Sequence, residues 1–371
     1  MRKKITRWTK YEPENYWKFN RQPDPIEIQL GYELIPLVDK SKTGAPLLKK
    51  LETMRNRIDA EYGIPCPKIH ITDNMFLDHN EYAIVINGVE IDSFKGAAPD
   101  KVLVMDTENV DKEKIIGEHT KDPAFGMDAV IVNKDESKKA EDLAYLVVDF
   151  STVICTHLTE LILTNADKII NQHIVNMVIE KVRKDNPDVV EDVLINKYFS
   201  ITELKTILIF LISERVPICD INTIFETLAD YYGYEKRLEF FAQKCRRRLA
   251  RQILLQQTGK QLHVIRLSDE MDDYLLNNME IPKPRVELPF FNLDPQMDKK
   301  LRNKIHDSIQ EISSKGYQPV ILCSEDIRFA FAYHFKNLHC VCISKEELRE
   351  AGEDFSVTVE EVIPYDRKYY R

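Results

Sequence analysis

The residues with the clearest potential for chemistry lie in the segment CTHLTE, residues 155–160. A thiol, an imidazole and a carboxylate are the groups of a nucleophilic catalyst, and on a helix His157 and Glu160 would be i, i+3 neighbours within hydrogen-bonding reach. Cys155 and His157, however, are two positions apart and would point about 200° away from each other around the helix axis. The spacing therefore favours an ordinary helix, whose two threonines form its polar face, over a catalytic site.

Two further groups of residues are candidates for a metal ion or an acid. Cys340 and Cys342 would lie on one face of a strand beside His339, but no further ligands follow at a spacing typical of zinc sites. Asp73 and Asn74 are typical turn residues, whose side chains bond the local backbone. The signature motifs of nucleotide-binding loops, serine hydrolases and zinc proteases do not occur. The sequence therefore predicts no catalytic residue, no cofactor and no metal.

The overall composition is that of a soluble, multidomain protein. The 371 residues predict two to four domains, with ordinary fractions of hydrophobic (43%) and charged (30%) residues. A formal net charge of -9 disfavours a nucleic-acid binder, whose surface is usually basic. The one basic run, KCRRR at residues 244–248, is expected to be the solvated face or last turn of a helix.

Cysteine usage and hydropathy describe the environment of the chain. Its seven cysteines are scattered and include no C-x-x-C pair, which fits a reducing compartment. No apolar segment of a secretory signal follows the first residues, MRKK, and no run approaches the roughly 18 apolar residues of a membrane-spanning helix. We therefore expect the chain as given to be soluble.

Hydrophobic periodicity divides the chain into a leading segment and three regions. Residues 1–25 hold three prolines and no sustained period, which indicates a linker. Its aromatic residues, Trp17 and Phe19 among them, are expected to dock on a neighbouring subunit. Strand and helix patterns mix from 26 to about 168, the chain is helical over 170–257, and strands alternate with helices after that.

Local signals mark several of the expected helix ends. Gly63 stands just past an amphipathic helix as a C-cap. Ser151 is expected to cap the helix that carries the CTHLTE segment. Ser200 and Glu203 form the S-x-x-E pattern of a capping box, and the proline-rich stretch 281–289 is expected to be a loop.

The segment KDPAFG, residues 121–126, places an aromatic residue in a turn. Pro123 and Gly126 favour a turn directly before the strand expected at 129–132. Turns are normally polar because their backbone needs water. Phe125 therefore either packs back into its own core or awaits a binding partner.

Seven segments of the sequence occur together in an order found in a known family. They are IQLGYELIPLVD, AEYGIPCPKIHITDN, NEYAIVINGVEI, KDPAFGMDAVIV, VVDFSTVICTHLTELI, ISERVPICDINTIFETLADY and CRRRLARQI. On these segments the chain resembles the cytoplasmic half of the export-gate protein of type III secretion, the FlhA/SctV family. The resemblance covers residues 26–255 and extends more weakly to 365. The PAFG and STVICTHL segments are more similar to the flagellar branch than to the injectisome branch.

Together with the periodicity, this resemblance implies an α/β multidomain fold class. It has two small α/β subdomains, one inserted in the other, an all-α helical subdomain and a C-terminal α/β subdomain. The implied bounds are 26–100 with 150–169, 101–149, 170–257 and 258–371. The family's membrane domain is absent from this sequence, so the chain is either an excised cytoplasmic half or a stand-alone relative.

The resemblance also implies a function. In the family this half forms a nine-subunit ring at the cytoplasmic face of the bacterial inner membrane, where it receives export chaperones with bound secretion substrates and orders their export. The implied partners are those complexes, other export-apparatus proteins and further copies of the chain, with no nucleic acid and no enzymatic activity. An injectisome homologue and a soluble scaffold that binds no client are the alternatives.

By motif position, the client cleft of the family corresponds to five residues of this sequence. Asp122 and Phe125 belong to the KDPAFG turn, Thr156 belongs to the following helix, and Val148 and Val153 lie beneath them. The resemblance implies that Phe125 is an apolar anchor for the partner. A carboxylate beside such an anchor commonly orients the partner through its charge, and we expect this of Asp122.

Overall fold

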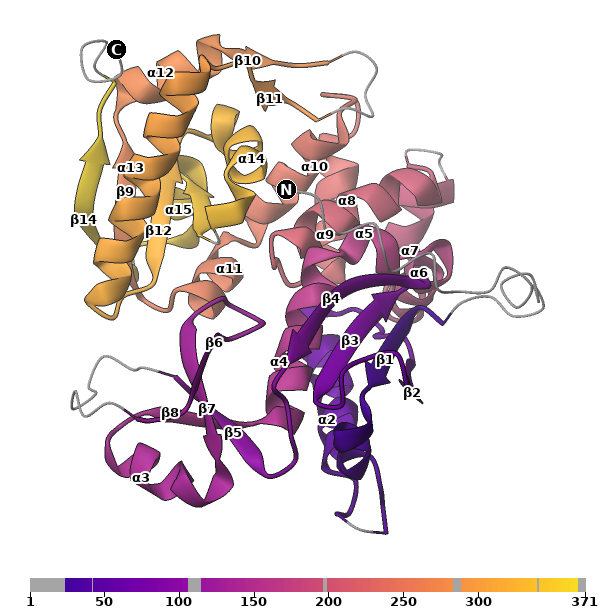
Figure 1. Cartoon of the computed structure of the whole chain (residues 1–371). Helices are drawn as coiled ribbons and strands as arrows, with labels where there is room; N and C mark the ends of the chain where they lie inside the picture. Colours follow the sequence, from indigo (N-terminus) through magenta and orange to yellow (C-terminus); the bar gives the residue numbers. More distant parts are fainter. Residues whose placement is uncertain are drawn as a thin grey trace.

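The described residues form three four-stranded sheets and one two-stranded sheet, and along the chain a helical region follows the second four-stranded sheet and precedes the third (Figure 1). The computed structural model describes residues 24–41, 43–105, 115–195, 199–282, 288–338 and 340–365. The α/β multidomain fold class is confirmed, whereas the exact subdomain bounds stay a prediction. Trp17 and Phe19 lie outside the described residues.

The first sheet has the strand order β2-β1-β3-β4. Its strands are β1 (Ile26–Leu30), β2 (Ile69–Asp73), β3 (Glu81–Ile86) and β4 (Val89–Lys95). Strand β1 is parallel to β2 and antiparallel to β3, and the crossover between β1 and β2 passes through η2 (Tyr32–Leu37) and α2 (Pro46–Tyr62). Gly63 ends α2 in the left-handed conformation, with φ of 72°, as the sequence predicts.

The second sheet is inserted between β4 and helix α4 (Phe150–Thr164). It contains β5 (Lys101–Met105), β6 (Glu118–Lys121), β7 (Asp128–Asn133) and β8 (Leu146–Asp149), with η3 (Lys134–Glu136) and α3 (Ser137–Asp142) between the last two. Alternate residues of β5 enter different cores. Val102 and Val104 pack with Ala140 of α3, whereas Leu103 and Met105 join the core that contains α4. The alternation therefore fixes the sheet against α4.

One continuous core joins the first sheet to the helical region. The helices of that region are α5 (Ala166–Ile169), α6 (Gln172–Asp185), α7 (Pro187–Val190), the π-helix η4 (Glu191–Ile195), α8 (Ile201–Ser213), α9 (Ile221–Tyr231), α10 (Leu238–Arg248) and α11 (Ala250–Gln257). The capping box predicted at the start of α8 is confirmed, because Ser200 and Glu203 exchange both hydrogen bonds.

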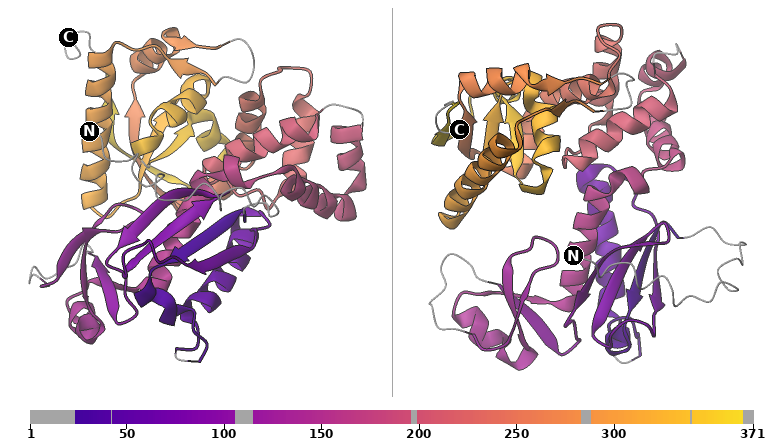
Figure 2. Two further views of the ribbon diagram at one scale, coloured as in Figure 1. Left: turned by 45° about the vertical axis from the view of Figure 1, so that its right-hand side comes forward. Right: turned by 45° about the horizontal axis from the view of Figure 1, so that its top comes forward.

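The third sheet is parallel and is covered by helices on both faces (Figure 2). Its order is β13-β12-β9-β14, with β9 (Gln261–Leu267), β12 (Pro319–Cys323), β13 (Val341–Ser344) and β14 (Ser356–Ile363). The connecting elements are α12 (Asp269–Asn277), β10 (Met279–Glu280), β11 (Phe290–Phe291), α13 (Pro295–Ser314), α14 (Glu325–His334), η5 (Lys336–Leu338) and α15 (Lys345–Ala351). Helix α11 belongs to the helical region by sequence, but its Ala250 and Leu254 pack on this sheet.

The N-cap of α4 corrects one prediction. Asp149, not Ser151, caps the helix, because its carboxylate accepts the backbone N–H of Thr152 at 3.2 Å, and Ser151 is buried in the first turn. Ser and Asp are comparable N-caps in isolation. The chain passes directly from β8 into α4, and Lys50 of α2 donates to Asp149 at 2.5 Å. Packing between α2 and the β8–α4 junction therefore favours Asp149, rather than Ser151, as the N-cap of α4.

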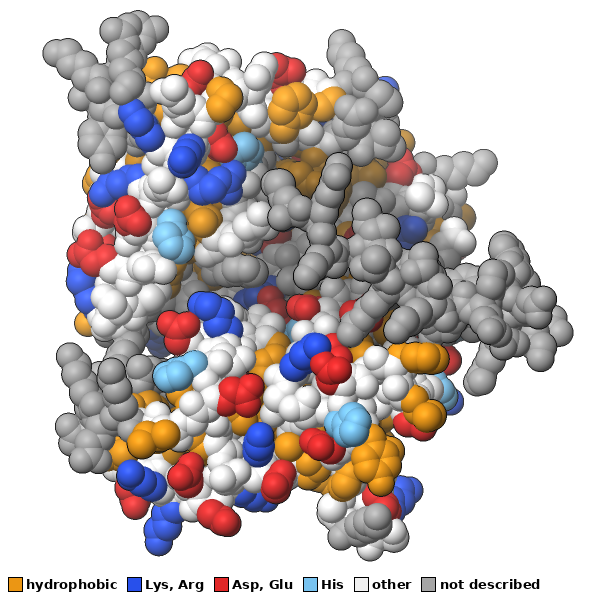
Figure 3. Space-filling model, viewed as in Figure 1, with side chains coloured by type: hydrophobic (Ala, Val, Ile, Leu, Met, Phe, Trp, Pro, Cys, Tyr) orange, Lys and Arg blue, Asp and Glu red, His pale blue; other side chains and the backbone are white. Residues whose placement is uncertain are grey.

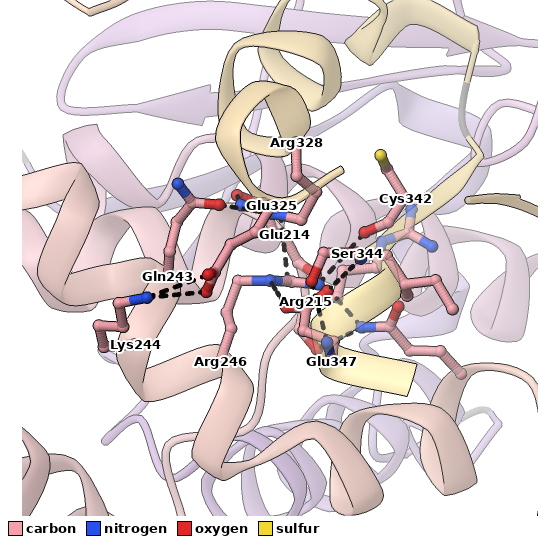
Figure 4. A network of polar contacts seen from close by, with 12 residues as sticks. Glu214, Arg215, Gln243, Lys244, Arg246, Glu325, Arg328, Cys342, Ser344 and Glu347 are labelled. Atoms are coloured by element: carbon pink, nitrogen blue, oxygen red, sulfur yellow. Dashed lines mark hydrogen bonds and ion pairs between the residues drawn. The ribbon is translucent and has the colours of Figure 1, made fainter. Parts of the chain in front are cut away.

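The basic run at residues 244–248 corrects a second prediction (Figure 4). The run is the last turn of α10, as expected, and the Arg248 side chain is 50% exposed, but Arg246 is only 2% exposed. Its guanidinium lies 2.7 Å from a carboxylate oxygen of Glu347 in α15 and 3.1 Å from one of Glu214. Arg328 of α14 also donates to Glu214, with one distance of 3.0 Å. Arg246 thus reaches from α10 to the helices of the C-terminal sheet, and it shares the Glu214 carboxylate with Arg328 across that boundary.

Burial and the neighbouring charges act in opposite directions on the pKa of Glu214, the carboxylate that both arginines contact. Burial alone would raise the pKa of Glu214, but the charges of Arg328 and Arg246 outweigh burial and hold that pKa below its usual value. Glu214 therefore stays ionised at neutral pH and compensates both buried guanidinium groups.

Removing Arg246 is expected to destabilise the protein strongly. Arg246→Ala leaves Glu347, which is 3% exposed, without its cation, and losing one partner of a buried pair costs roughly 3–5 kcal/mol. Urea unfolding followed by circular dichroism measures this loss. Circular dichroism is preferred to tryptophan fluorescence because both tryptophans of the chain lie in the first 25 residues. Arg248→Ala is the matched control. Arg248 lies on the same helix, its side chain is 50% exposed and it pairs with Asp230 at 3.4 Å, so its loss costs less than about 1 kcal/mol. Equal losses for the two variants would contradict the assignment.

Candidate functional site

The KDPAFG segment forms the turn of the β6–β7 hairpin, at residues 122–127, which we call the hairpin turn. Two backbone bonds close it, from Asp122 N–H to the Met127 carbonyl and from Gly126 N–H to the Asp122 carbonyl, each 2.8 Å long. Gly126 has φ of 71°, and a Cβ placed there would meet nothing within 4 Å. Backbone conformation, rather than lack of space, therefore favours glycine at this position. The side chain of Phe125 is 55% exposed, and that of Met127 is 44% exposed.

Asp122 is buried within this turn, with 5% of its surface exposed. One oxygen of its carboxylate accepts the backbone N–H groups of Ala124 at 3.1 Å and of Phe125 at 2.7 Å. Asp122 also acts electrostatically on Tyr82 of β3. Burial raises the pKa of Tyr82 well above its usual value, and the charge of Asp122 adds to this effect. The buried carboxylate differs from the exposed orienting charge that the sequence predicts.

The remaining candidate residues lie at the junction between β8 and α4. Val153 is buried in the common core, and Val148 packs against the same core opposite Leu103 of β5. Thr156 lies on the next turn of α4 and is half-buried. The turn end of the β6–β7 hairpin points toward α4 in Figure 1 and in the right-hand view of Figure 2. The structure thus places Phe125 and Thr156 on two neighbouring elements, above the core that holds the two valines.

Two exposed apolar residues were missed by the sequence analysis. Met127 follows Gly126, and the strand alternation places it on the same face as Ala129 and Ile131, which pack toward α4. Leu146 begins β8 opposite Met105 and is 48% exposed. The alternation could have identified Met127, whereas the exposure of Leu146 depends on where the sheet ends. Both add apolar surface at the same end of the second sheet as Phe125.

The Cys155, His157 and Glu160 side chains have separate surroundings: Cys155 is buried, and the other two contact different residues. Burial raises the pKa of the Cys155 thiol to about 12, so it is protonated at neutral pH. His157 Nδ1 lies 3.0 Å from the Tyr82 hydroxyl, and Glu160 pairs with Arg215 of the helical region. These contacts tie α4 to the first sheet and to the helices, and they do not assemble the nucleophilic set considered from the sequence.

Within residues 24–365, leaving aside the undescribed gaps, no three His, Cys, Asp or Glu side chains are grouped to hold a metal ion. The sulfur atoms of Cys342 and Cys323 lie 3.8 Å apart. His339 lies outside the described residues. Across the same ranges no helix combines the length and the apolar character needed to cross a bilayer. On the face drawn in Figure 3, acidic and basic side chains are interspersed, with small hydrophobic groups between them.

Comparison with known proteins gives consistent matches over most of the chain. The sequence pattern of the FHIPEP family matches residues 2–352. The flagellar biosynthesis protein FlhA of Borreliella burgdorferi is 35% identical over 311 residues, which cover 82% of this chain and 43% of that protein. The FlhA protein of Bacillus subtilis is 30% identical over 308 residues, covering 82% of this chain and 44% of the relative. The chain thus spans less than half the length of these curated relatives.

Solved structures share the fold at lower sequence identity. The nonameric SctV-C of EPEC superposes with a TM-score of 0.71 at 19% identity, covering 92% of this chain and 99% of that one. The Chlamydia pneumoniae CdsV protein in its complex with CdsO gives a TM-score of 0.75 at 22% identity, covering 94% and 99%. These likenesses establish the same multidomain fold.

Replacing Phe125 is expected to leave the stability of the protein nearly unchanged. Because more than half of its side chain is exposed, Phe125→Ala should lower the free energy of unfolding by less than about 1 kcal/mol. Phe150→Ala is the matched control, since Phe150 is 1% exposed and a core truncation of this size costs about 3–5 kcal/mol. Urea unfolding of both variants decides the question that the sequence left open. A loss for Phe125→Ala as large as that for Phe150→Ala would mean that Phe125 is a core residue.

Proposed function

Because the chain belongs to the FHIPEP family, we propose that it is the cytoplasmic docking ring of a flagellar protein export gate. In this role it binds chaperone–substrate complexes and orders their export. The observation that carries the proposal is the exposed Phe125, held on a hydrogen-bonded turn beside α4. The relatives at 30–35% identity are flagellar proteins, which favours the flagellar branch over the injectisome branch.

The physical requirement for such a role is a rigid surface with an apolar anchor. An aromatic side chain that becomes buried on binding commonly supplies a large part of the binding energy. Phe125, Met127 and Leu146 offer exposed apolar surface at one end of the second sheet, and Thr156 offers a hydroxyl on α4. The client site that we propose consists of this surface and of Val148 and Val153 beneath it. Receiving a folded complex in this way needs no reacting group.

Assembly into a ring is part of the proposal. A structure with this fold is described as nonameric, and another is a complex between CdsV and CdsO, which supports self-assembly and further export-apparatus partners. We propose that Trp17 and Phe19 close the ring by docking on the adjacent subunit. The ring would lie at the cytoplasmic face of the bacterial inner membrane.

Two substitutions at the proposed client site are expected to weaken binding without unfolding the protein. Phe125→Ala removes the anchor and should cost on the order of 2 kcal/mol of binding free energy. Thr156→Lys adds a long charged side chain on α4 and should also reduce affinity. Isothermal titration calorimetry with a purified flagellar chaperone–substrate complex from the same organism measures both effects.

Phe76→Ala is the matched control for this experiment. Phe76 is 73% exposed, but it follows β2 at the opposite edge of the first sheet from β4. Its replacement should leave the affinity unchanged. Full affinity of Phe125→Ala and Thr156→Lys would overturn the client site, and absence of binding by the unmodified protein would favour a scaffold that binds no client.

Self-association is expected to depend on concentration and on the leading segment. The chain should be a monomer at low micromolar concentration and form rings when it is concentrated or held at a membrane. Trp17→Ala and Phe19→Ala should reduce this association, because each removes a large apolar contact. Analytical ultracentrifugation over a concentration series measures it, with Trp8→Ala as a control in the same segment. A stable ring of the unmodified chain at micromolar concentration, or unchanged association of the Trp17 variant, would contradict the proposal.

A further inference from the structure

Strand β14 forms an open edge of the C-terminal sheet. The sheet order ends at β14, so no described strand pairs with its outer side, and β14 is the outermost strand at the left of Figure 1. The other edge strand, β13, is closed by packing. Its Cys342, Ile343 and Ser344 are at most 6% exposed, and Arg246 of α10 donates to the Cys342 carbonyl at 3.3 Å. Only β14 thus leaves backbone groups of this sheet open, on the described part of the chain, to a further strand.

Two valines of β14 lie on one face of this edge. Val357 is paired in register with Leu262 of β9, and Val359 with Val264. Paired residues of neighbouring strands point to the same face, so both valines lie on the face where α11 and α15 pack. These helices do not shield β14, because Val357 is 40% exposed and Val359 is 48% exposed.

A β-bulge adds a third valine to the same face. The register between β14 and β9 shifts at Glu360, so Glu361 takes the next paired place and Val362 pairs with Arg266. Strict alternation from Val359 would turn Val362 to the opposite face, and the extra residue brings it back. Val362 is 39% exposed. We call the three side chains, Val357, Val359 and Val362, the valine row.

The acidic residues of β14 do not block its outer edge. Charged side chains commonly protect an open edge strand from pairing. Here Glu360 lies 2.7 Å from Nδ1 of His263 and 3.3 Å from Nζ of Lys315, and Glu361 pairs with Lys304 of α13. These contacts hold both carboxylates on the α13 side of the sheet, away from the valine row.

The chain that follows β14 also leaves on the α13 side. Tyr365 stacks on Tyr274 of α12 with ring centroids 4.3 Å apart, and both rings pack on the core that contains α13. The described residues after the strand therefore leave the valine row uncovered.

A cation lies at one end of the valine row. Arg266 is exposed, and because it pairs with Val362 its side chain lies on the same face. Its charge acts on Asp269 and Glu270 of α12, but no described carboxylate lies within ion-pair distance of it. A partner segment with a carboxylate at this end would complement the charge of Arg266.

We propose that the edge of β14 binds an extended segment of a partner protein, which adds a fifth strand to the C-terminal sheet. The segment has apolar side chains at alternate positions, over the valine row, and a carboxylate beside Arg266. Backbone hydrogen bonds provide affinity in this mode of binding, and the side chains provide selectivity. The site is separate from the proposed client site on the second sheet, and the inference does not rest on the proposed function.

Two fluorescein-labelled hexapeptides of opposite direction, ETVTVT and TVTVTE, are the probes. Each has valines at alternate positions and the glutamate on the same face as the valines. The glutamate meets Arg266 when ETVTVT runs antiparallel to β14, or when TVTVTE runs parallel to it. Fluorescence anisotropy measures binding of each peptide to the unmodified protein, and we expect one of them to bind saturably.

Backbone methylation of the bound peptide separates strand addition from simple apolar contact. Alternate N–H groups of a strand face the same side. One of two modified peptides, N-methylated at its threonines or at its valines, should therefore bind at least about tenfold more weakly, because two or three hydrogen bonds are lost. The other should bind as the parent peptide does. Bound peptide should also slow amide hydrogen exchange in β14.

Variants of the protein test the side chains. Val359→Lys puts a charge in the middle of the valine row and should lower the affinity about tenfold or more, and Thr358→Lys is the matched control. Thr358 is exposed and pairs with His263, so it lies on the opposite face, and its variant should bind normally. Arg266→Gln should weaken binding of the glutamate peptide about threefold and leave its glutamine version unaffected.

Three results would overturn the inference. They are no saturable binding of either peptide, equal affinity of both N-methylated forms and the parent, and equal affinity of Val359→Lys and the unmodified protein. Circular dichroism during urea unfolding confirms that the variants are folded. None of these results affects the proposed function, which is tested at Phe125 with a chaperone–substrate complex.

Discussion

Burial of helix α4 is the constraint on which the arrangement of the first two sheets depends. Val153, Ile154, Leu158 and Ile162 are each at most 2% exposed, and burying a side chain of this size contributes about 1.5–3 kcal/mol. The helix packs on α2 and on strands β5 and β8 of the inserted sheet. Since one helix completes the core of both sheets, the position of the hairpin turn relative to the first sheet is set by apolar packing.

Where the C-terminal sheet meets the rest, paired charges add to the apolar packing of α11. Arg246 and Arg328 are almost completely buried and share Glu214, which remains ionised between them. Buried ion pairs add little net stability compared with an apolar contact, but they tolerate few alternative geometries because every charge needs its partner. Apolar packing thus supplies stability around α4, and paired charges specify the orientation at the boundary of the helical region.

Much of the fold could be predicted from the sequence, because strong periodicity and local caps agree with the tertiary structure at Gly63, at Ser200 and along the buried strands. The exceptions have physical causes. Helix α12 gives only a weak sequence signal, because only Met271 and Leu275 of its apolar positions are deeply buried, too few to give a period. The solvation of the 244–248 run and the cap of α4 depend on residues about 100 positions away. At the candidate site the sequence located the turn, but whether Phe125 faces solvent and Asp122 faces inward is decided by packing.

Helix α11 has a consequence for how the protein can be divided. A cut at residue 257, where the composition changes, would separate Ala250 and Leu254 from the sheet face formed by Leu262, Val264 and Val320. Ala351 of α15 packs on the same face, so α11 and α15 cover it together and the cut would remove one of its two helices. The C-terminal sheet is therefore not an autonomous folding unit with its own boundary. It borrows part of its covering layer from the preceding region, and a fragment intended to isolate it has to begin before Ala250.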